Sequence, residues 1–129
     1  MKVFDLDGAR EVLTVIKPMV EAINTRREEL YILLNQLEDE QDKLERLYLE
    51  SQIRDVDVEI KKYLQKIESL GGVIKGTDPL LVDFLSVYKD RYIWLCWRED
   101  EDTILYWHEL DEGFAGRKPI KSLKVHEDL

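Results

Sequence analysis

The side chains best suited to chemistry are concentrated in one stretch of the 129-residue chain, from Asp83 to Pro119. This stretch contains all three tryptophans, the only cysteine and one of the two histidines, His108. An imidazole titrates near neutral pH and can move a proton when a carboxylate holds it in place. His108, Glu109 and Asp83 are therefore the candidate catalytic residues, although no Ser-His-Asp order, zinc-protease motif or dinucleotide-binding fingerprint accompanies them.

His108 and Glu109 are predicted to lie in one strand, where consecutive side chains point to opposite faces. They cannot bind one metal ion by adjacency, and we expect His108 to be bonded to a carboxylate or a carbonyl. General acid–base work and metal binding are the alternatives for this imidazole. Asp83 lies in an apolar stretch, where a carboxylate needs a partner, and Arg91 and Arg117 are its candidate partners.

The turn Gly113-Phe114-Ala115-Gly116-Arg117 is a candidate anion site. Its two glycines, Gly113 and Gly116, let backbone N–H groups converge on an anion, and Arg117 would add a bidentate contact. The alternative is a tight turn that buries Phe114 and pairs Arg117 with an acid. The glycine spacing differs from that of a P-loop.

We predict no cofactor and no metal centre. Cys96 lies in a strand predicted to be buried and is interpreted as packing, because buried thiols away from positive charge are inert. A divalent-metal site among Asp83, His108 and Asp111 is the weakest alternative. A lone cysteine forms no internal disulfide, which favours a reducing cytoplasm.

The charge balance excludes nucleic acid as a partner. The net charge is −9, with 28 acidic residues against 19 Lys and Arg, whereas phosphate binding needs an excess of basic residues. No window of about 20 residues is free of charge, so we expect no membrane span. The first ten residues lack the pattern of a signal peptide, and we expect a cytoplasmic, acidic protein.

Apolar residues recur in steps of three and four over Ala9–Leu37 and over Leu44–Leu70, which predicts two long helices. The polar run Glu38–Lys43 is the predicted reversal between them, and a phase slip near Ser51 is a second place for a turn. Gly71-Gly72 predicts the end of the second helix, because glycine enters the left-handed region at no cost.

The period changes after Gly72, and three strands are predicted at about Leu80–Leu85, Tyr92–Arg98 and Thr103–Leu110. Helices followed by strands predict an α+β fold, in which a long antiparallel helical hairpin packs on a small antiparallel β-sheet of about three strands. We expect a single domain, with residues 1–72 as the hairpin and 73–129 as the β-hairpin base and C-terminal tail.

A four-residue loop at Glu99–Asp102 would place Trp94 opposite Trp107 and Ile93 opposite His108. Both faces of that β-hairpin are then apolar or aromatic, whereas a sheet with one helical layer has a polar outer face. The C-terminal segment, the helices or a second copy of the chain must cover the second face. A homodimer is the favoured solution.

Four motifs follow one another in this stretch, namely Leu81-Val82-Asp83-Phe84, Leu95-Cys96-Trp97, Tyr106-Trp107-His108-Glu109 and the run from Gly113 to Pro119. Together they resemble an uncharacterised prokaryotic family known as domain of unknown function 2203. The start of the chain is also similar, although Lys17 stands where a leucine is usual. The resemblance covers the whole chain, supplies no activity, and implies that the family's motifs are matched by Asp83, Trp97, Trp107, His108, Glu109, Gly113, Gly116 and Arg117.

The leading hypothesis is a small cytoplasmic, self-associating interaction or scaffold protein, whose coiled-coil-like hairpin also offers a surface to an unidentified protein partner. The alternative is an enzyme or a small-anion-binding protein with its site at the Gly113–Arg117 turn, beside Asp83, His108 and Glu109. The distances between these side chains and their exposure distinguish the two hypotheses.

Overall fold

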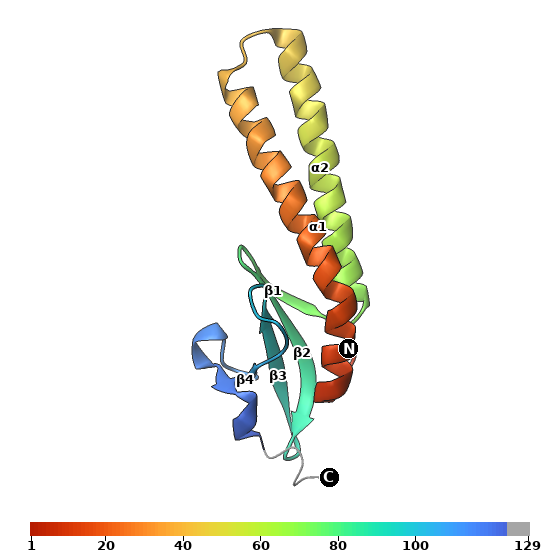
Figure 1. Ribbon diagram of the computed structural model, residues 1–129, viewed down its shortest axis with the longest axis vertical. Helices are drawn as coiled ribbons and strands as arrows, with labels where there is room; N and C mark the ends of the chain where they lie inside the picture. The colour runs from red at the N-terminus through yellow and green to blue at the C-terminus, as the bar shows by residue number, and fades with distance from the viewer. Residues whose placement is uncertain (124–129) are drawn as a thin grey trace. The chain divides into compact units, whose positions relative to one another are not determined.

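The computed structural model describes residues 1–123 and confirms the α+β fold, with two helices followed by an antiparallel sheet (Figure 1). Two compact units are present: Pro18–Lys66, the hairpin unit, and Met1–Lys17 with the chain from Ile67 onward, the sheet unit. The single-domain expectation stays a prediction, and its tail beyond Leu123 lies outside the described residues. The elements in chain order are α1 (Leu6–Asp39), α2 (Lys43–Ser69), β1 (Val73–Thr77), β2 (Leu80–Tyr88), β3 (Arg91–Arg98), β4 (Tyr106–Glu109), η1 (Phe114–Gly116), β5 (Lys118–Pro119) and η2 (Ile120–Ser122).

The hairpin unit consists of the parts of α1 and α2 that lie within Pro18–Lys66, and they run antiparallel (Figure 1). The reversal lies inside the predicted Glu38–Lys43 run, and α2 continues unbroken past Ser51. The Arg46 guanidinium fixes the turn, because one nitrogen donates to the carbonyls of Leu37 and Glu40 at 2.8 Å each. The seam between the helices buries a single apolar stripe, made of Val20, Ile23, Leu33, Leu49, Val56 and Ile60.

Glycine ends α2 as the sequence predicts. Gly71 has a φ of 103°, a conformation that costs a glycine nothing and strains other residues. The N–H of Gly72 then donates to the Ile67 carbonyl at 3.3 Å, which satisfies one of the last free acceptors of the helix. The chain can thereby turn directly into β1.

The sheet has five strands in the order β1-β2-β3-β4-β5, so the prediction of about three strands was too low. The sequence signal missed β1 because it contains Gly76, where the register against β2 shifts. It missed β5 because that strand has only two residues, Lys118 and Pro119, too few to show a period. Both strands flank the three that the sequence predicted.

The register of β3 against β4 corrects the predicted β-hairpin. Trp94 pairs with His108 rather than with Trp107. The connection spans residues 99–105, an odd number, because β4 begins at Tyr106 rather than at Thr103. Contacts from outside the hairpin hold this longer loop: an Arg10 nitrogen donates to the Ile104 carbonyl at 2.7 Å. A slip of one residue moves every side chain of β4 to the other face.

One face of the sheet forms the apolar core of the sheet unit. Phe84 is fully buried, and its ring meets that of Phe4 edge to face at 5.4 Å between centroids. The Phe4 N–H donates to the Leu85 carbonyl at 2.7 Å, which holds the segment before α1 against β2. The core also contains Ala9, Leu13, Ile16, Val82, Ile93, Leu95, Trp97 and Trp107.

The opposite face is closed by side chains from the same chain. The Lys75 ammonium lies 4.2 Å from the centre of the Trp94 ring, and the Arg117 guanidinium lies 4.1 Å from that of Tyr106. Trp94 is only 7% exposed without any second copy. The two-sided apolar sheet that favoured a dimer is therefore covered within the chain to a large extent.

Candidate functional site

Three side chains from three adjacent strands meet on the face of the sheet opposite the apolar core, the face that carries Trp94 and Tyr106. Asp83 of β2 pairs with Cys96 of β3, and His108 of β4 pairs with Trp94, two residues from Cys96. One carboxylate oxygen, the thiol sulfur and one ring nitrogen all lie within 4.8 Å of one another. The three residues are 1–3% exposed. We call them the Asp-Cys-His cluster.

Asp83 and His108 share a proton. Nε2 of His108 lies 2.9 Å from Oδ2 of Asp83, and Nδ1 lies 2.9 Å from the backbone carbonyl of Glu109. A carbonyl only accepts, so Nδ1 carries a hydrogen, and a second hydrogen lies between Nε2 and Oδ2. The expected bonds of His108 to a carboxylate or carbonyl are confirmed, whereas Arg91 and Arg117 were wrong as partners of Asp83.

The cluster also contains an unpaired oxygen. Oδ1 of Asp83 is buried and has no hydrogen-bond partner of good geometry within residues 1–123. The Cys96 thiol lies close to this carboxylate, and its pKa is raised, first by burial and then by the negative charge of Asp83. The sulfur is therefore a protonated thiol at neutral pH in the metal-free protein, not a nucleophilic thiolate.

A cavity of about 280 Å³ adjoins the Asp-Cys-His cluster. The three cluster residues form part of its wall together with Lys75, Leu81, Glu112, Gly113 and Phe114. The cavity thus combines a shared proton, a thiol and a lysine ammonium. A small polar ligand that entered it would meet His108 and Asp83 directly.

Glu109 does not belong to the cluster. Its carboxylate binds the Arg91 guanidinium through two hydrogen bonds, at 2.9 and 2.7 Å. These bonds lower the pKa of Glu109. The predicted separation of His108 and Glu109 onto opposite faces is thus confirmed, and the predicted catalytic trio reduces to Asp83 and His108.

The backbone of the Gly113–Arg117 turn is bonded to itself. The N–H of Gly116 donates to the Gly113 carbonyl at 2.9 Å, and that of Arg117 donates to the Phe114 carbonyl at 3.2 Å. A Cβ at Gly116 would come within 2.9 Å of the Glu112 side chain, which explains a glycine there. Two of the N–H groups expected to bind an anion are thus already occupied.

Arg117 is paired with an acid. One of its nitrogens donates to both carboxylate oxygens of Glu101, at 2.6 and 2.5 Å, and both side chains are nearly buried. Its guanidinium also covers the rings of Tyr106 and Phe114, at 4.1 and 4.6 Å. This pairing agrees with the alternative given for the turn, although Phe114 remains 43% exposed instead of entering the core.

The sequence analysis did not place Cys96 with Asp83 and His108. In the predicted register His108 lies opposite Ile93, which puts it on the other face from Cys96. The observed register, with His108 opposite Trp94, brings the two to the same face. The signal was present, because Asp83, Cys96 and His108 each lie within one of three successive strand motifs.

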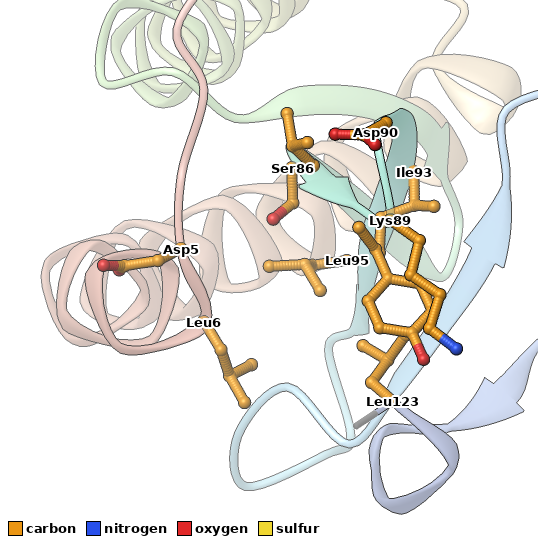
Figure 2. Close-up of a pocket in the computed structure, with 10 residues that line it drawn as sticks. Asp5, Leu6, Ser86, Lys89, Asp90, Ile93, Leu95 and Leu123 are labelled. Carbon is orange, nitrogen blue, oxygen red and sulfur yellow. The ribbon is translucent and has the colours of Figure 1, made fainter. Parts of the chain in front are cut away.

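A larger hollow of about 600 Å³ lies elsewhere in the sheet unit (Figure 2). Leu6, Leu95 and Leu123 line it from α1, β3 and the end of η2. Two of its polar groups have structural tasks: the Asp5 carboxylate accepts an N–H from the first turn of α1, and the Ser86 hydroxyl donates to a backbone carbonyl. The hollow is thus less equipped for chemistry than the cavity beside His108.

The hairpin unit carries a second candidate site, an apolar surface. Seven large apolar side chains in this unit are between 47% and 76% exposed. They lie on both helices, and a two-helix hairpin buries only the stripe between its helices. We call this set the hairpin surface: Tyr31, Ile32, Leu34, Leu44, Leu47, Tyr48 and Val58.

A family model described as "Uncharacterized conserved protein (DUF2203)" matches residues 2–120. Neither the comparison with curated proteins nor that with solved structures gave a match. Neither of the two helices has an apolar stretch of the length needed to cross a bilayer, within the part of the chain that the structure describes. The family description names no activity.

Proposed function

The chain belongs to the DUF2203 family of uncharacterized conserved proteins, and we propose that it is a self-associating interaction protein whose hairpin unit joins two copies. The observation that carries this proposal is the exposed hairpin surface. A globular helix pair of this length keeps its large apolar side chains at the seam, whereas here Leu44 is 76% exposed and Tyr31 68%. The lone free cysteine fits a reducing compartment such as the cytoplasm.

The second copy is the occupant that fits this surface best. Two hairpins that pack side by side form a four-helix bundle, in which each helix buries a second stripe. A two-fold contact needs one surface that complements itself, and apolar side chains on both helices supply it. Full burial of each such side chain stabilises by about 1.5–3 kcal/mol, and the combined gain must exceed the translational and rotational freedom that association removes.

Several charged residues of the hairpin unit are paired within the chain. Arg26 is paired with Glu29 and Glu59, at 2.6 and 3.2 Å, and Lys61 is paired with Asp57 at 2.7 Å. All of these pairs are exposed, and opposite charges lie side by side. The segment from Glu38 to Glu50, which contains Leu44 and Leu47, has six acidic and two basic residues, so two copies repel one another there, and salt weakens this repulsion.

Sedimentation velocity tests the proposal, because a monomer has a mass of 15.3 kDa. We expect a dimer at micromolar concentration and a monomer for the double variant Leu34→Glu/Leu47→Glu. Both residues are already about half exposed, so the variant keeps its helical circular-dichroism spectrum. Val15→Glu is the matched control: Val15 is 51% exposed on the same helix but lies in the sheet unit.

Two results would overturn self-association through the hairpin. One is a wild-type chain that sediments as a monomer, which would leave the hairpin surface for a different protein partner. The other is a dimer that survives Leu34→Glu/Leu47→Glu and dissociates with Val15→Glu. The second result would move the contact to the sheet unit.

An enzyme or a small-anion-binding protein is the second candidate, supported by the cavity beside the Asp83–His108 pair. Lys75 supplies positive charge in its wall, whereas Arg117 is engaged with Glu101. We expect a phosphorylated or carboxylated metabolite to raise the melting temperature, and Lys75→Met to remove that rise. No rise with any such compound would count against this candidate.

A further inference from the structure

The Asp-Cys-His cluster has the composition of a metal site. A carboxylate, a thiol and an imidazole are the three side-chain classes that bind zinc, and their ligand atoms lie within 4.8 Å of one another. Asp83, Cys96 and His108 are held by neighbouring strands, so their backbones are fixed in register. We propose that these three residues bind a zinc-like transition-metal ion, independently of any association through the hairpin unit.

The unpaired oxygen of Asp83 points to a missing partner. A buried carboxylate oxygen without a hydrogen-bond donor costs about 1–3 kcal/mol or more, because it has lost its water and gained nothing. Oδ1 of Asp83 is in this position, while Oδ2 is bonded to His108. A cation bound to Asp83 removes this penalty, and one carboxylate oxygen, the thiol sulfur and one ring nitrogen lie within 4.8 Å of one another.

His108 already has the outer contact of a metal ligand. A metal-binding histidine usually donates its second ring N–H to a carbonyl or carboxylate, which fixes the ring and its tautomer. Nδ1 of His108 meets the Glu109 carbonyl at 2.9 Å, so Nε2 is the nitrogen left to face Asp83 and Cys96. The ring therefore needs no rotation to present Nε2 to an ion.

The donor set selects the class of metal. A thiolate is too soft a ligand for Mg²⁺ or Ca²⁺, whereas sulfur, nitrogen and oxygen together suit Zn²⁺ and Co²⁺. Metal–ligand distances of about 2.0–2.3 Å bring the three atoms closer to one another than 4.8 Å, so binding draws the side chains inward. Three protein ligands leave a fourth position, and the cavity of about 280 Å³ lies on the open side.

Binding must release protons. Cys96 has to lose its thiol proton before the sulfur can bind, and the hydrogen shared by Asp83 and His108 has to leave Nε2, while Nδ1 keeps its own. About two protons are therefore released for each divalent ion bound. Because binding releases protons, affinity increases as pH rises.

Cobalt gives the most direct test, because it reports the sulfur ligand. Full-length protein stripped with EDTA is titrated with Co²⁺ and then with Zn²⁺. We expect about one Co²⁺ per chain, a sulfur-to-cobalt charge-transfer band in the near ultraviolet, and loss of that band when Zn²⁺ displaces the cobalt. A wild-type chain that shows no such band under saturating Co²⁺ overturns the proposal.

Variants assign the ligands. Cys96→Ser preserves the shape of the side chain, and we expect it to abolish the band and weaken Zn²⁺ binding at least about tenfold. Asp83→Asn and His108→Gln should weaken binding as well. Glu109→Gln is the matched control, because Glu109 is next to His108 in the chain and faces the other way.

The controls separate this site from adventitious surface binding. Circular dichroism establishes that each variant is folded. If Cys96→Ser does not fold, the presence or absence of the sulfur-to-cobalt band in the wild-type protein decides whether the cluster binds metal through sulfur. An unchanged cobalt spectrum in folded Cys96→Ser overturns the proposal. So does an equal loss of binding in Glu109→Gln or in Asp111→Asn, an exposed acid outside the cluster.

Discussion

The two units of the molecule differ in how deeply they bury their ionic groups. The sheet unit buries charged and polar groups in pairs: Asp83 with His108, and Arg117 with Glu101. The hairpin unit keeps its ion pairs in water and leaves large apolar side chains exposed, with Leu44 at 76%. Both units leave large apolar side chains exposed, for example Tyr92 at 53% and Leu110 at 51% in the sheet unit, so the contrast between the units lies in their buried ion pairs.

This difference separates two kinds of function. Buried, fixed polar groups beside a cavity are the arrangement that binds ions and small ligands, because a low local dielectric strengthens each contact. Exposed apolar side chains on a simple helical element are the arrangement that binds another protein chain. We therefore propose ligand chemistry for the sheet unit and association for the hairpin unit.

The largest expected effect comes from breaking the buried pair of the sheet unit. His108→Leu leaves Asp83 buried without a partner, and we expect the metal-free protein to lose about 3–5 kcal/mol of unfolding free energy in urea denaturation. Arg26→Leu is the control in the hairpin unit, where the pair with Glu29 is exposed, and it should change nothing measurable. Equal losses in the two variants would contradict the contrast between the units.

A smaller loss of unfolding free energy is expected when Arg117, which covers the face of the sheet opposite the apolar core, is removed. Arg117→Ala removes the partner of Glu101 and the cover over Tyr106, and we expect a loss of about 2 kcal/mol in the same measurement. Lys61→Ala is its counterpart in the hairpin unit, because the Lys61–Asp57 pair is exposed on both sides. An unchanged unfolding free energy in Arg117→Ala would show that Arg117 does not stabilise this face of the sheet.

Local patterns predicted the hairpin unit well. Each helix and each helix end was predicted from a short segment of sequence. The signals were the steps of three and four between apolar residues, the polar run at Glu38–Lys43 and the glycine at Gly71. The alternation that separates His108 from Glu109 is equally local, and it was confirmed. These features need no knowledge of which segments meet in space.

The Asp-Cys-His cluster could not be predicted in the same way, because it depends on long-range contacts. Its assembly requires the register of β3 and β4, which follows from the length of the 99–105 loop. That length is set partly by Arg10, which binds the Ile104 carbonyl from a distant part of the chain. The same limit explains why Arg91 and Arg117 were chosen as partners of Asp83 instead of His108.

Raising the pH should lower the unfolding free energy of the metal-free protein through the titration of Cys96 in the sheet unit. Its folded-state pKa is raised above the unfolded value of about 8.5, so the folded metal-free chain holds a proton that the unfolded chain releases. This contribution to stability is complete below pH 8.5 and is lost above it, by up to about 1.4 kcal/mol per pH unit. Urea denaturation with EDTA at several pH values measures the slope.

Cys96→Ser is the control for this pH effect, because a serine hydroxyl does not titrate in the range. We expect its stability to change less with pH above 8.5 than that of the wild type. The hairpin unit contains no cysteine, so none of the difference arises there. If the unfolding free energies of the two proteins change with pH in parallel, the surroundings of the Cys96 thiol do not raise its pKa.

The smallest expected effect tests whether the hairpin surface contributes to the unfolding free energy of the monomer. Leu47 is 54% exposed, so Leu47→Ala should change the unfolding free energy of the monomer by no more than about 0.5 kcal/mol at a protein concentration where the dimer is dissociated. Leu33→Ala, at the seam and 8% exposed, should cost about 2 kcal/mol or more. If Leu47→Ala weakens dimerisation while leaving the monomer unchanged, the side chain serves association alone. A monomer destabilised as much by Leu47→Ala as by Leu33→Ala would mean that the hairpin covers Leu47 itself, and the proposed association through the hairpin surface would lose its basis.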